Sequence, residues 1–414
     1  MTGPKSAVHS AAQGLQEEMR AWRRHLHARP EVAFEEHETS DFIAAQLERL
    51  GAFQLRRGVG GTGVVADLRR GAGPLVALRA DMDALPIEER SGVAFPSQHP
   101  GRMHACGHDG HMAMLLGAAD ILTQLFAEGS LAGGVRLIFQ PAEEAADAQG
   151  RTGAARMLEE GVLEGVSLAL ALHVNPYEPT GVVQLADGYA MASVDTFEGV
   201  IVGRGGHGAY PDLAVDPIWL LAPVLTALHG IVSRRVSPLE TAVVTVGRVA
   251  GGTAPNVIPA EVTLEGTMRA YDPRIRALLE TEVERAFSLV RSLGGDYRLR
   301  FIHESPALRN APDVNRLYVQ ALSALPKETR IHLAPFGLGG EDFAFIAEAV
   351  PAAMAFLGCR PEGRPPAGLH TPEFDLDERC LPIGAALLAE SARQVLTGEF
   401  PLPSGPRGGA VSHA

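Results

Sequence analysis

The side chains best suited to chemistry are concentrated in a histidine-rich segment, HACGHDGH at residues 104–111, and in a few short clusters elsewhere. The candidate metal ligands are Cys106, His108, Glu144, His173 and His370. Neutral imidazoles, a thiolate and carboxylates bind zinc and similar divalent ions, and catalytic sites often hold two such ions side by side. Glu143, next to Glu144, supplies a further carboxylate that is available as a general base. The set as a whole predicts a hydrolytic metal site.

Each of these residues also has an ordinary structural explanation. A single histidine at the end of an apolar run is most often a satisfied core or surface group, and adjacent glutamates commonly form a solvated turn. The functional interpretation is favoured because four of the five clusters follow an apolar run, and open α/β sheets bind ligands outside the carboxyl ends of their strands. The runs and their clusters are PLVALRA with Asp81 and Asp83, GVRLIFQ with Glu143 and Glu144, SLALAL with His173, and AAMAFLG with the loop of His370.

Cys106 has a second possible role. The segment HACGHDGH lies directly before a predicted helix, and the positive field of a helix N-terminus and a nearby metal both favour the thiolate. A cysteine hydrolase with Cys106 as nucleophile and His108 or His111 as its base is therefore an alternative to a metal enzyme. That alternative leaves the carboxylate clusters and the other histidines unexplained.

The surrounding apolar patterns predict an α/β catalytic domain with a central mixed sheet flanked by helices. Continuous runs such as PLVALRA and VSLALALHV are typical of strands buried on both faces, and helical patterns such as HMAMLLGAADILTQLFAEG lie between them. In the middle of the chain the strands alternate better and two long helical patterns occur, which indicates a smaller α+β layer. The expected boundaries are 1–187 for the first part of the catalytic domain, 188–304 for an inserted lid, and 305–414 for the second part, with a loose tail after about residue 398.

Composition and charge exclude several classes of partner. The 414 residues are 46% hydrophobic and 21% charged, so the chain can bury a large core over two domains. Its formal net charge of −13, without a basic patch, argues against nucleic acid and anionic membranes as partners. The N-terminal segment lacks the apolar core of a signal peptide and no run of about 18 apolar residues is present, so we expect a cytoplasmic protein.

Two glycine-rich segments match the dinucleotide-binding pattern G-x-G-x-x-G but lack its context. GVGGTG at residues 58–63 precedes a strand pattern where the motif needs a helix. GRGGHG at residues 203–208 has no acid about 20 residues further on. We therefore expect no nucleotide binding.

The ordered motifs of the chain resemble those of the M20 family of metallopeptidases and amidohydrolases, in particular the branch of hippurate hydrolases and indole-acetyl-amino-acid hydrolases. The resemblance covers nearly the whole sequence. The matching segments are WRRHLHARPEVAFEEHET, GGTGVVA, ALRADMDALPI, HACGHDGHMAMLLGAA, IFQPAEE, ALHVNP, GRGGHGAYP, GGTAPNVIPAEVTLEGTMRAYD, GGEDFAFI and GLHTPEF.

The resemblance implies a role for each site residue. The ligands of two divalent ions would be Cys106, His108, Glu144, His173 and His370, with Cys106 as the bridge. Glu143 would be the general acid and base, and Asp83 would orient a ligand histidine. On the lid, His207, Asn256 and Arg269 match positions expected to hold the carbonyl oxygen and α-carboxylate of the substrate. The ions would be manganese, zinc, nickel or cobalt.

The resemblance also implies the substrate and the assembly. We expect a small N-acyl amino acid as substrate and a homodimer formed through the lid. An N-carbamoyl amino acid hydrolase and an N-acetyl-diaminopimelate deacetylase are alternatives within the same superfamily. The chain departs from the family pattern after the lid histidine, where it has Tyr210 and Asp212 in place of the usual methionine and further histidine.

Overall fold

The structure is a computed structural model, and it describes residues 4–325, 329–363 and 366–402. The chain forms two compact units. The first consists of Met1–Ala190, Arg309–Phe336 and Asp342–Ala414, and the second of Met191–Leu308 with Gly337–Glu341. The lid boundaries expected from the sequence, 188 and 304, lie a few residues from the observed division. They shift because Gly188–Tyr189 pairs with Arg309–Asn310 in the first unit and because the last lid strand runs to Ser305.

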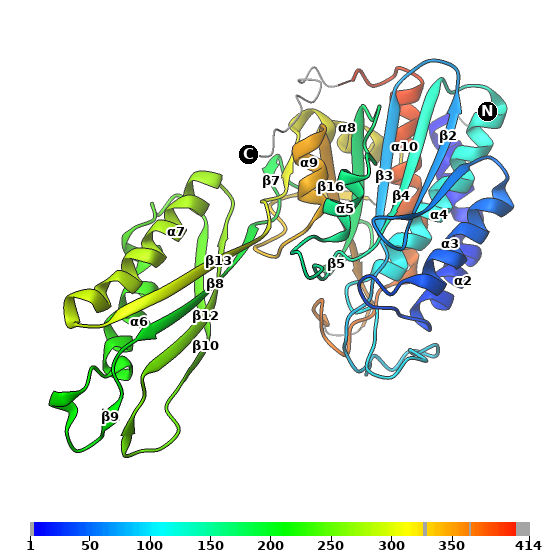
Figure 1. Cartoon of the computed structure of the whole chain (residues 1–414). Helices are drawn as coiled ribbons and strands as arrows, with labels where there is room; N and C mark the ends of the chain where they lie inside the picture. Colours follow the sequence, from blue (N-terminus) through cyan, green and yellow to red (C-terminus); the bar gives the residue numbers. More distant parts are fainter. Residues whose placement is uncertain (1–3, 326–328, 364–365, 403–414) are drawn as a thin grey trace. The chain divides into compact units, whose positions relative to one another are not determined.

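The first unit is built on a mixed sheet of eight strands (Figure 1). In spatial order the strands are β1 (Gln54–Val59), β2 (Gly63–Arg70), β4 (Gly133–Gln140), β3 (Leu75–Asp81), β5 (Leu168–Pro179), β16 (Ala352–Arg360), β6 (Val182–Leu185) and β15 (Arg330–Leu333). The central pairs β4 with β3, β3 with β5 and β5 with β16 are parallel, whereas β1, β2 and β4 pair antiparallel. Every residue of β3 and β4 is buried, which explains their uninterrupted apolar sequences.

Helices cover both faces of this sheet. They are α1 (Pro4–Gly14), α2 (Gln16–His27), α3 (His37–Leu50), α4 (His108–Glu128), α5 (Gly153–Glu159), α8 (Pro312–Leu322), α9 (Phe343–Ala349) and α10 (Leu381–Leu396), with a 3₁₀ turn at Glu378–Cys380. On β3, Leu78 belongs to the same core cluster as the apolar residues of α4, whereas the neighbouring Arg79 binds Asp342 at the start of α9. Successive strand residues point to opposite faces, so α4 and α9 cover different sides.

The second unit is an antiparallel sheet of four strands with two helices, and the sequence patterns predicted both helices and three of the strands. The strands in spatial order are β10 (Ala242–Gly251), β12 (Glu261–Ala270), β8 (Ser193–Val202) and β13 (Asp296–Ser305), and the helices are α6 (Pro217–Arg234) and α7 (Pro273–Ser288) with 3₁₀ turns at Pro211–Leu213 and Leu289–Leu293. Strand β12 alternates between buried and part-exposed residues, so only one face is covered. Gly199 on β8 lies against the ring of Phe287 of α7. A larger residue would clash there, because a Cβ at this position would be 2.2 Å from the ring.

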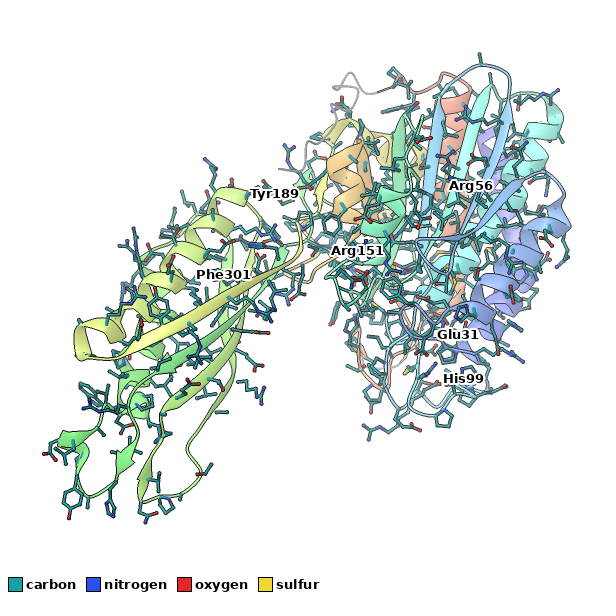
Figure 2. All side chains as sticks on the ribbon, in the orientation of Figure 1. Glu31, Arg56, His99, Arg151, Tyr189 and Phe301 are labelled. Atoms are coloured by element: carbon teal, nitrogen blue, oxygen red, sulfur yellow. The ribbon has the colours of Figure 1, made fainter. Side chains whose placement is uncertain are left out.

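Short strand pairs complete the two units. In the second unit β9 (Gly206–His207) pairs with β11 (Val257–Ile258), and in the first unit β7 (Gly188–Tyr189) pairs with β14 (Arg309–Asn310). Strand β13 was not predicted, although the alternation of Tyr297, Leu299 and Phe301 is a strand pattern that would have revealed it. Figure 2 labels Phe301 on that strand.

Two expectations from the sequence need correction. The tail was expected to be loose after residue 398, but Phe400 is buried in the core and its N–H donates to the Gln394 carbonyl. Residues from 403 onward lie outside the described part. Among the described residues, α4 and α6 are long and apolar enough to cross a membrane by length and composition, whereas no such segment was expected. The apolar length of α4 is accounted for by its burial in the core of the first unit.

Candidate metal centre

The structure brings all five predicted ligands together in the first unit. They form two overlapping groups, in each of which the ligand atoms lie within 4.8 Å of one another. One group is Cys106, His108 and His173, and the other is Cys106, Glu144 and His370. Cys106 is the member that the two groups share, and its Sγ lies 3.5 Å from His173 Nε2. This arrangement fits two ions that share one thiolate.

The local backbone explains how residues from separate segments reach one place. The chain passes from Cys106 into α4 through Gly107, whose φ is 86° and where a Cβ would lie 2.4 Å from Val174. His108 is therefore the first residue of α4, whereas the sequence analysis placed the whole histidine segment before the helix. His370 has a φ of 60°, and its N–H donates to the Ala105 carbonyl at 2.9 Å. This bond fixes the His370 loop beside Cys106.

Hydrogen bonds set which nitrogen of each ligand histidine faces the cluster. His108 Nδ1 lies 2.8 Å from the Asp83 carbonyl, and His173 Nδ1 lies 2.8 Å from the Val174 carbonyl. A carbonyl only accepts, so both Nδ1 atoms carry the proton and both Nε2 atoms have a free lone pair. The Nε2 of His108 is buried and has no hydrogen-bond partner among the described residues. A buried nitrogen of this kind is what a metal ligand requires.

The carboxylates and the thiol of the site also favour the binding of cations. Burial, together with Glu144, Glu143 and Asp81, raises the pKa of the Cys106 thiol well above its ordinary value. Burial works against a charge on His108, but the nearby carboxylates, Asp81 foremost, outweigh it and raise the pKa of His108 to about 10. The expected effect of the helix N-terminus on the pKa of Cys106 is therefore overcome by burial and by the surrounding carboxylates. Divalent ions would stabilise the Cys106 thiolate and so lower the pKa of its thiol, and this set of donors therefore fits a metal site.

Glu143 is held beside the ligands without belonging to the two ligand groups that share Cys106. Its N–H and that of Glu144 donate to the two carboxylate oxygens of Asp83, at 3.1 and 2.9 Å. The N–H of Asp342 donates to Glu143 Oε1 at 3.4 Å. Asp83 was predicted to orient a ligand histidine through its carboxylate. Its main-chain carbonyl lies 2.8 Å from His108 Nδ1 and its carboxylate 3.4 Å from the same nitrogen, and the carboxylate also fixes the backbone of the glutamate pair.

His111 and Asp81 form a supporting pair that the sequence analysis did not assign. His111 Nε2 accepts the N–H of Val174 at 2.9 Å, and its Nδ1 donates to Asp81 Oδ1 at 2.6 Å. Both nitrogens are occupied, so His111 is not available as a base for Cys106. The three-residue spacing in HDGH places His108 and His111 on one helix face, which is the sequence signal for this pair.

The predicted substrate-binding residues lie in the second unit at two separate positions. His207 is exposed and pairs with Val257, next to Asn256, whose carbonyl accepts the Gly208 N–H at 2.8 Å. Arg269 lies near the other end of β12, opposite Val194, and makes no ion pair with the described residues. Strand β12 has 10 residues and spans about 30 Å. A small substrate cannot reach both positions within one lid.

Tyr210 and Asp212, the departures from the family pattern, lie close to His207. The rings of Tyr210 and His207 have centroids 5.3 Å apart, and the Tyr210 N–H donates to the His207 carbonyl at 2.9 Å. Asp212 belongs to the exposed 3₁₀ turn Pro211–Leu213. Any effect of this segment on substrate preference is thus exerted beside His207.

Comparison with known proteins places the chain in a family. A model of Peptidase family M20/M25/M40 matches residues 77–394. N-acetyl-L-cysteine deacetylase of Bacillus subtilis (strain 168) is 40% identical over 387 residues, covering 92% of this chain and 89% of the relative. IAA-amino acid hydrolase ILR1-like 4 of Arabidopsis thaliana is 39% identical over 381 residues, covering 90% and 84%.

A solved structure agrees with this assignment. The YXEP protein of Bacillus subtilis, described as a dinuclear metal-binding peptidase of the M20 family, matches with a TM-score of 0.81 and 34% identity over 94% of this chain and 100% of that one. The fold and the paired ligand groups thus define a dinuclear metallohydrolase. The chain belongs to the M20 family and, within it, to the amidohydrolase branch of the N-acetylcysteine deacetylase and the IAA-amino acid hydrolases.

Removing the metal separates the two roles considered for Cys106. Chelation should abolish hydrolysis, and adding back zinc or manganese should restore it, because the bound ions would polarise the carbonyl and lower the pKa of the attacking water. Alkylation of Cys106, followed by mass spectrometry, should be faster in the metal-free protein than in the loaded one, since coordination occupies Sγ. Cys359 and Cys380 are buried internal controls and should react equally in both states. Full activity in metal-free protein would contradict the metal-dependent interpretation and favour a cysteine hydrolase with Cys106 as nucleophile.

Proposed function

We propose that this protein hydrolyses the amide bond of N-acyl amino acids, releasing a carboxylic acid and a free amino acid. The observation that carries the proposal is the position of Glu143, a carboxylate fixed beside two ligand groups that share Cys106. Two relatives that are 40% and 39% identical to this chain are named for the removal of an acyl group from an amino acid. N-carbamoyl and N-acetyl-diaminopimelate substrates are alternatives within the superfamily.

The chain's own residues supply the proton transfers. The ions would be held by Cys106, His108, Glu144, His173 and His370, and when bound they would polarise a carbonyl and lower the pKa of water to about 7. Glu143 accepts the proton of the attacking water and passes it to the leaving nitrogen. Asp83 keeps Glu143 in place by accepting its N–H and that of Glu144.

We propose that the lid supplies the groups that recognise the substrate. The Ala209 N–H donates to His207 Nδ1 at 3.1 Å, so the neutral ring carries its proton on Nε2 as an exposed donor. Such a donor suits the developing oxyanion, with Asn256 next to it. Arg269, permanently charged and able to form two parallel hydrogen bonds, suits the α-carboxylate.

The separation of these groups favours a homodimer in which His207 acts on the partner's substrate. His207 and Arg269 cannot contact one small molecule from the same lid, because most of β12 lies between them. In a two-fold dimer, one lid would supply Arg269 to a substrate and the partner's lid would supply the His207 donor to the same substrate. The second unit has an exposed edge strand, β10, and exposed apolar side chains around the 3₁₀ turn Pro211–Leu213 and the start of α6, namely Leu213, Ile218 and Trp219. These surfaces suit a second copy of the chain.

We propose zinc, manganese, nickel or cobalt as the ions. Thiolate and imidazole ligands suit zinc, cobalt and nickel, and carboxylates also accept manganese. A panel of N-acetyl, N-benzoyl, N-carbamoyl and indole-acetyl amino acids, assayed with each ion, distinguishes the substrates and the metals.

Replacing the proposed base tests the mechanism. Glu143→Gln should lower kcat at least about 100-fold, because an amide cannot accept the proton of water, while its Oε1 still accepts the Asp342 N–H. Metal content should stay at the wild-type value. The matched control is Glu144→Gln, which should lower metal content because Glu144 is a ligand. Turnover of Glu143→Gln within a few-fold of wild type would remove Glu143 from the mechanism.

Mixed dimers test whether His207 acts in trans. Glu143→Ala and His207→Ala proteins, each nearly inactive, are dissociated together and allowed to re-pair, and hybrids are confirmed by native mass spectrometry. Half of randomly paired dimers are hybrids and one of the two sites in each has both residues intact, so about a quarter of wild-type activity should return. Each variant re-paired with itself is the control. Hybrids without regained activity would show that His207 serves its own subunit.

A further inference from the structure

Two family-like motifs have no role in the mechanism described so far, yet they meet at the loop that carries Glu143. Glu36 comes from WRRHLHARPEVAFEEHET, and Thr62 comes from GGTGVVA. Glu36 Oε1 accepts the N–H of Ala142 at 2.8 Å, and the Thr62 hydroxyl donates to Glu36 Oε2. Glu36 and Ala142 are completely buried, and Thr62 is nearly so. The contact joins a helix start, a strand turn and the residue before Glu143.

Ala142 has a backbone conformation that needs support. Its φ is 47°, in the left-handed region that a residue with a Cβ enters at a cost. Its N–H is held by Glu36 and its carbonyl accepts the Gly153 N–H at 2.9 Å. The turn at Ala142 directs the next two N–H groups to Asp83. Two buried carboxylates, Glu36 and Asp83, thus hold three consecutive N–H groups around Glu143.

The usual explanation for an acid at this position does not apply to Glu36. Glu36 precedes helix α3 as its N-cap, but its side chain makes no capping hydrogen bond. Glu31 takes that role, because its two carboxylate oxygens accept the N–H groups of Glu38 and Thr39 at 3.1 and 2.8 Å. The carboxylate of Glu36 is therefore free to serve the Glu143 loop.

We propose that Glu36, kept in place by Thr62, is a positioning residue for Glu143. Its hydrogen bond to Ala142 holds the left-handed turn from which Glu143 reaches the reacting water. This inference rests on the proposed function, since it assigns a residue to the same proton transfer. Burial, and then the charge of Asp83, raises the pKa of Glu36 to about 7, so a glutamine is a close substitute for its neutral form.

The first test compares Glu36→Ala with Glu36→Gln. Glu36→Ala should lower kcat by about 10- to 100-fold with KM and metal content unchanged, because a displacement of about 1 Å at a catalytic group has an effect of this size. Glu36→Gln should retain kcat within about threefold, since its carbonyl oxygen can still accept the Ala142 N–H. If Glu36→Ala does not fold, Thr62→Val takes its place, with an expected loss of about threefold to tenfold in kcat. Wild-type kcat in the alanine variant, or in its substitute, would overturn the proposal.

Glu31→Ala is the matched control. Glu31 is also buried, lies in the same segment and also accepts backbone N–H groups, but it serves the start of α3 (Figure 2 labels Glu31). Its loss should lower the melting temperature and leave kcat within about twofold of wild type. A purely structural role for Glu36 would instead give both alanine variants the same kcat.

The second test is a double-mutant cycle with Ala142→Gly. Glycine adopts positive φ without the Cβ penalty, so the turn at residue 142 depends less on Glu36 in that background. Glu36→Ala should then lower kcat at least about threefold less than it does in the wild-type background. Equal losses in both backgrounds would show that Glu36 does not act through Ala142. An inactive wild-type protein on every N-acyl amino acid would instead contradict the proposed function itself.

Discussion

Buried negative charge is the constraint on which the rest of the structure depends. Cys106, Asp83, Glu143 and Glu144 lie around one small volume in the first unit. Burying one such charge without a compensating charge costs several kcal/mol. For the four groups together, this cost is about as large as the net stability of the whole protein. Two divalent ions would bring about four positive charges, equal to one thiolate and three carboxylates. Two further carboxylates next to this cluster, Asp81 and Asp342, are compensated by Arg79, which forms an ion pair with each of them.

The sheet determines where these charged groups lie. Its parallel central strands run to one edge, so the loops after β3 and β4 deliver Asp83 and Glu144 to the place where His173 of β5 lies. Alternation along β3 sends apolar residues to the α4 side and Arg79 to the α9 side. Helix α4 then begins directly at the site, so His108 is placed by a rigid element packed on the sheet.

The ligand set and the catalytic domain could be predicted because both depend on local sequence. Residue type limits what His173 or Glu144 can bind, and a continuous apolar run limits where a strand can lie. The contact of Glu36 with Ala142 could not be predicted, because it joins segments far apart in sequence and depends on a left-handed φ at an alanine. Nor does residue type reveal that the Asp83 carboxylate, besides contacting the His108 ring, accepts two backbone N–H groups.

An alanine at residue 142, where a glycine would be less strained, has a physical rationale. Glycine would lower the cost of the turn but would also populate other backbone conformations, each of which moves Glu143. Alanine populates fewer of them, and the hydrogen bond from its N–H to Glu36 offsets the cost of the one that is needed. The catalytic carboxylate is thus fixed by a backbone that is strained locally and supported by distant residues. Precision at Glu143 therefore depends on segments that never touch the substrate.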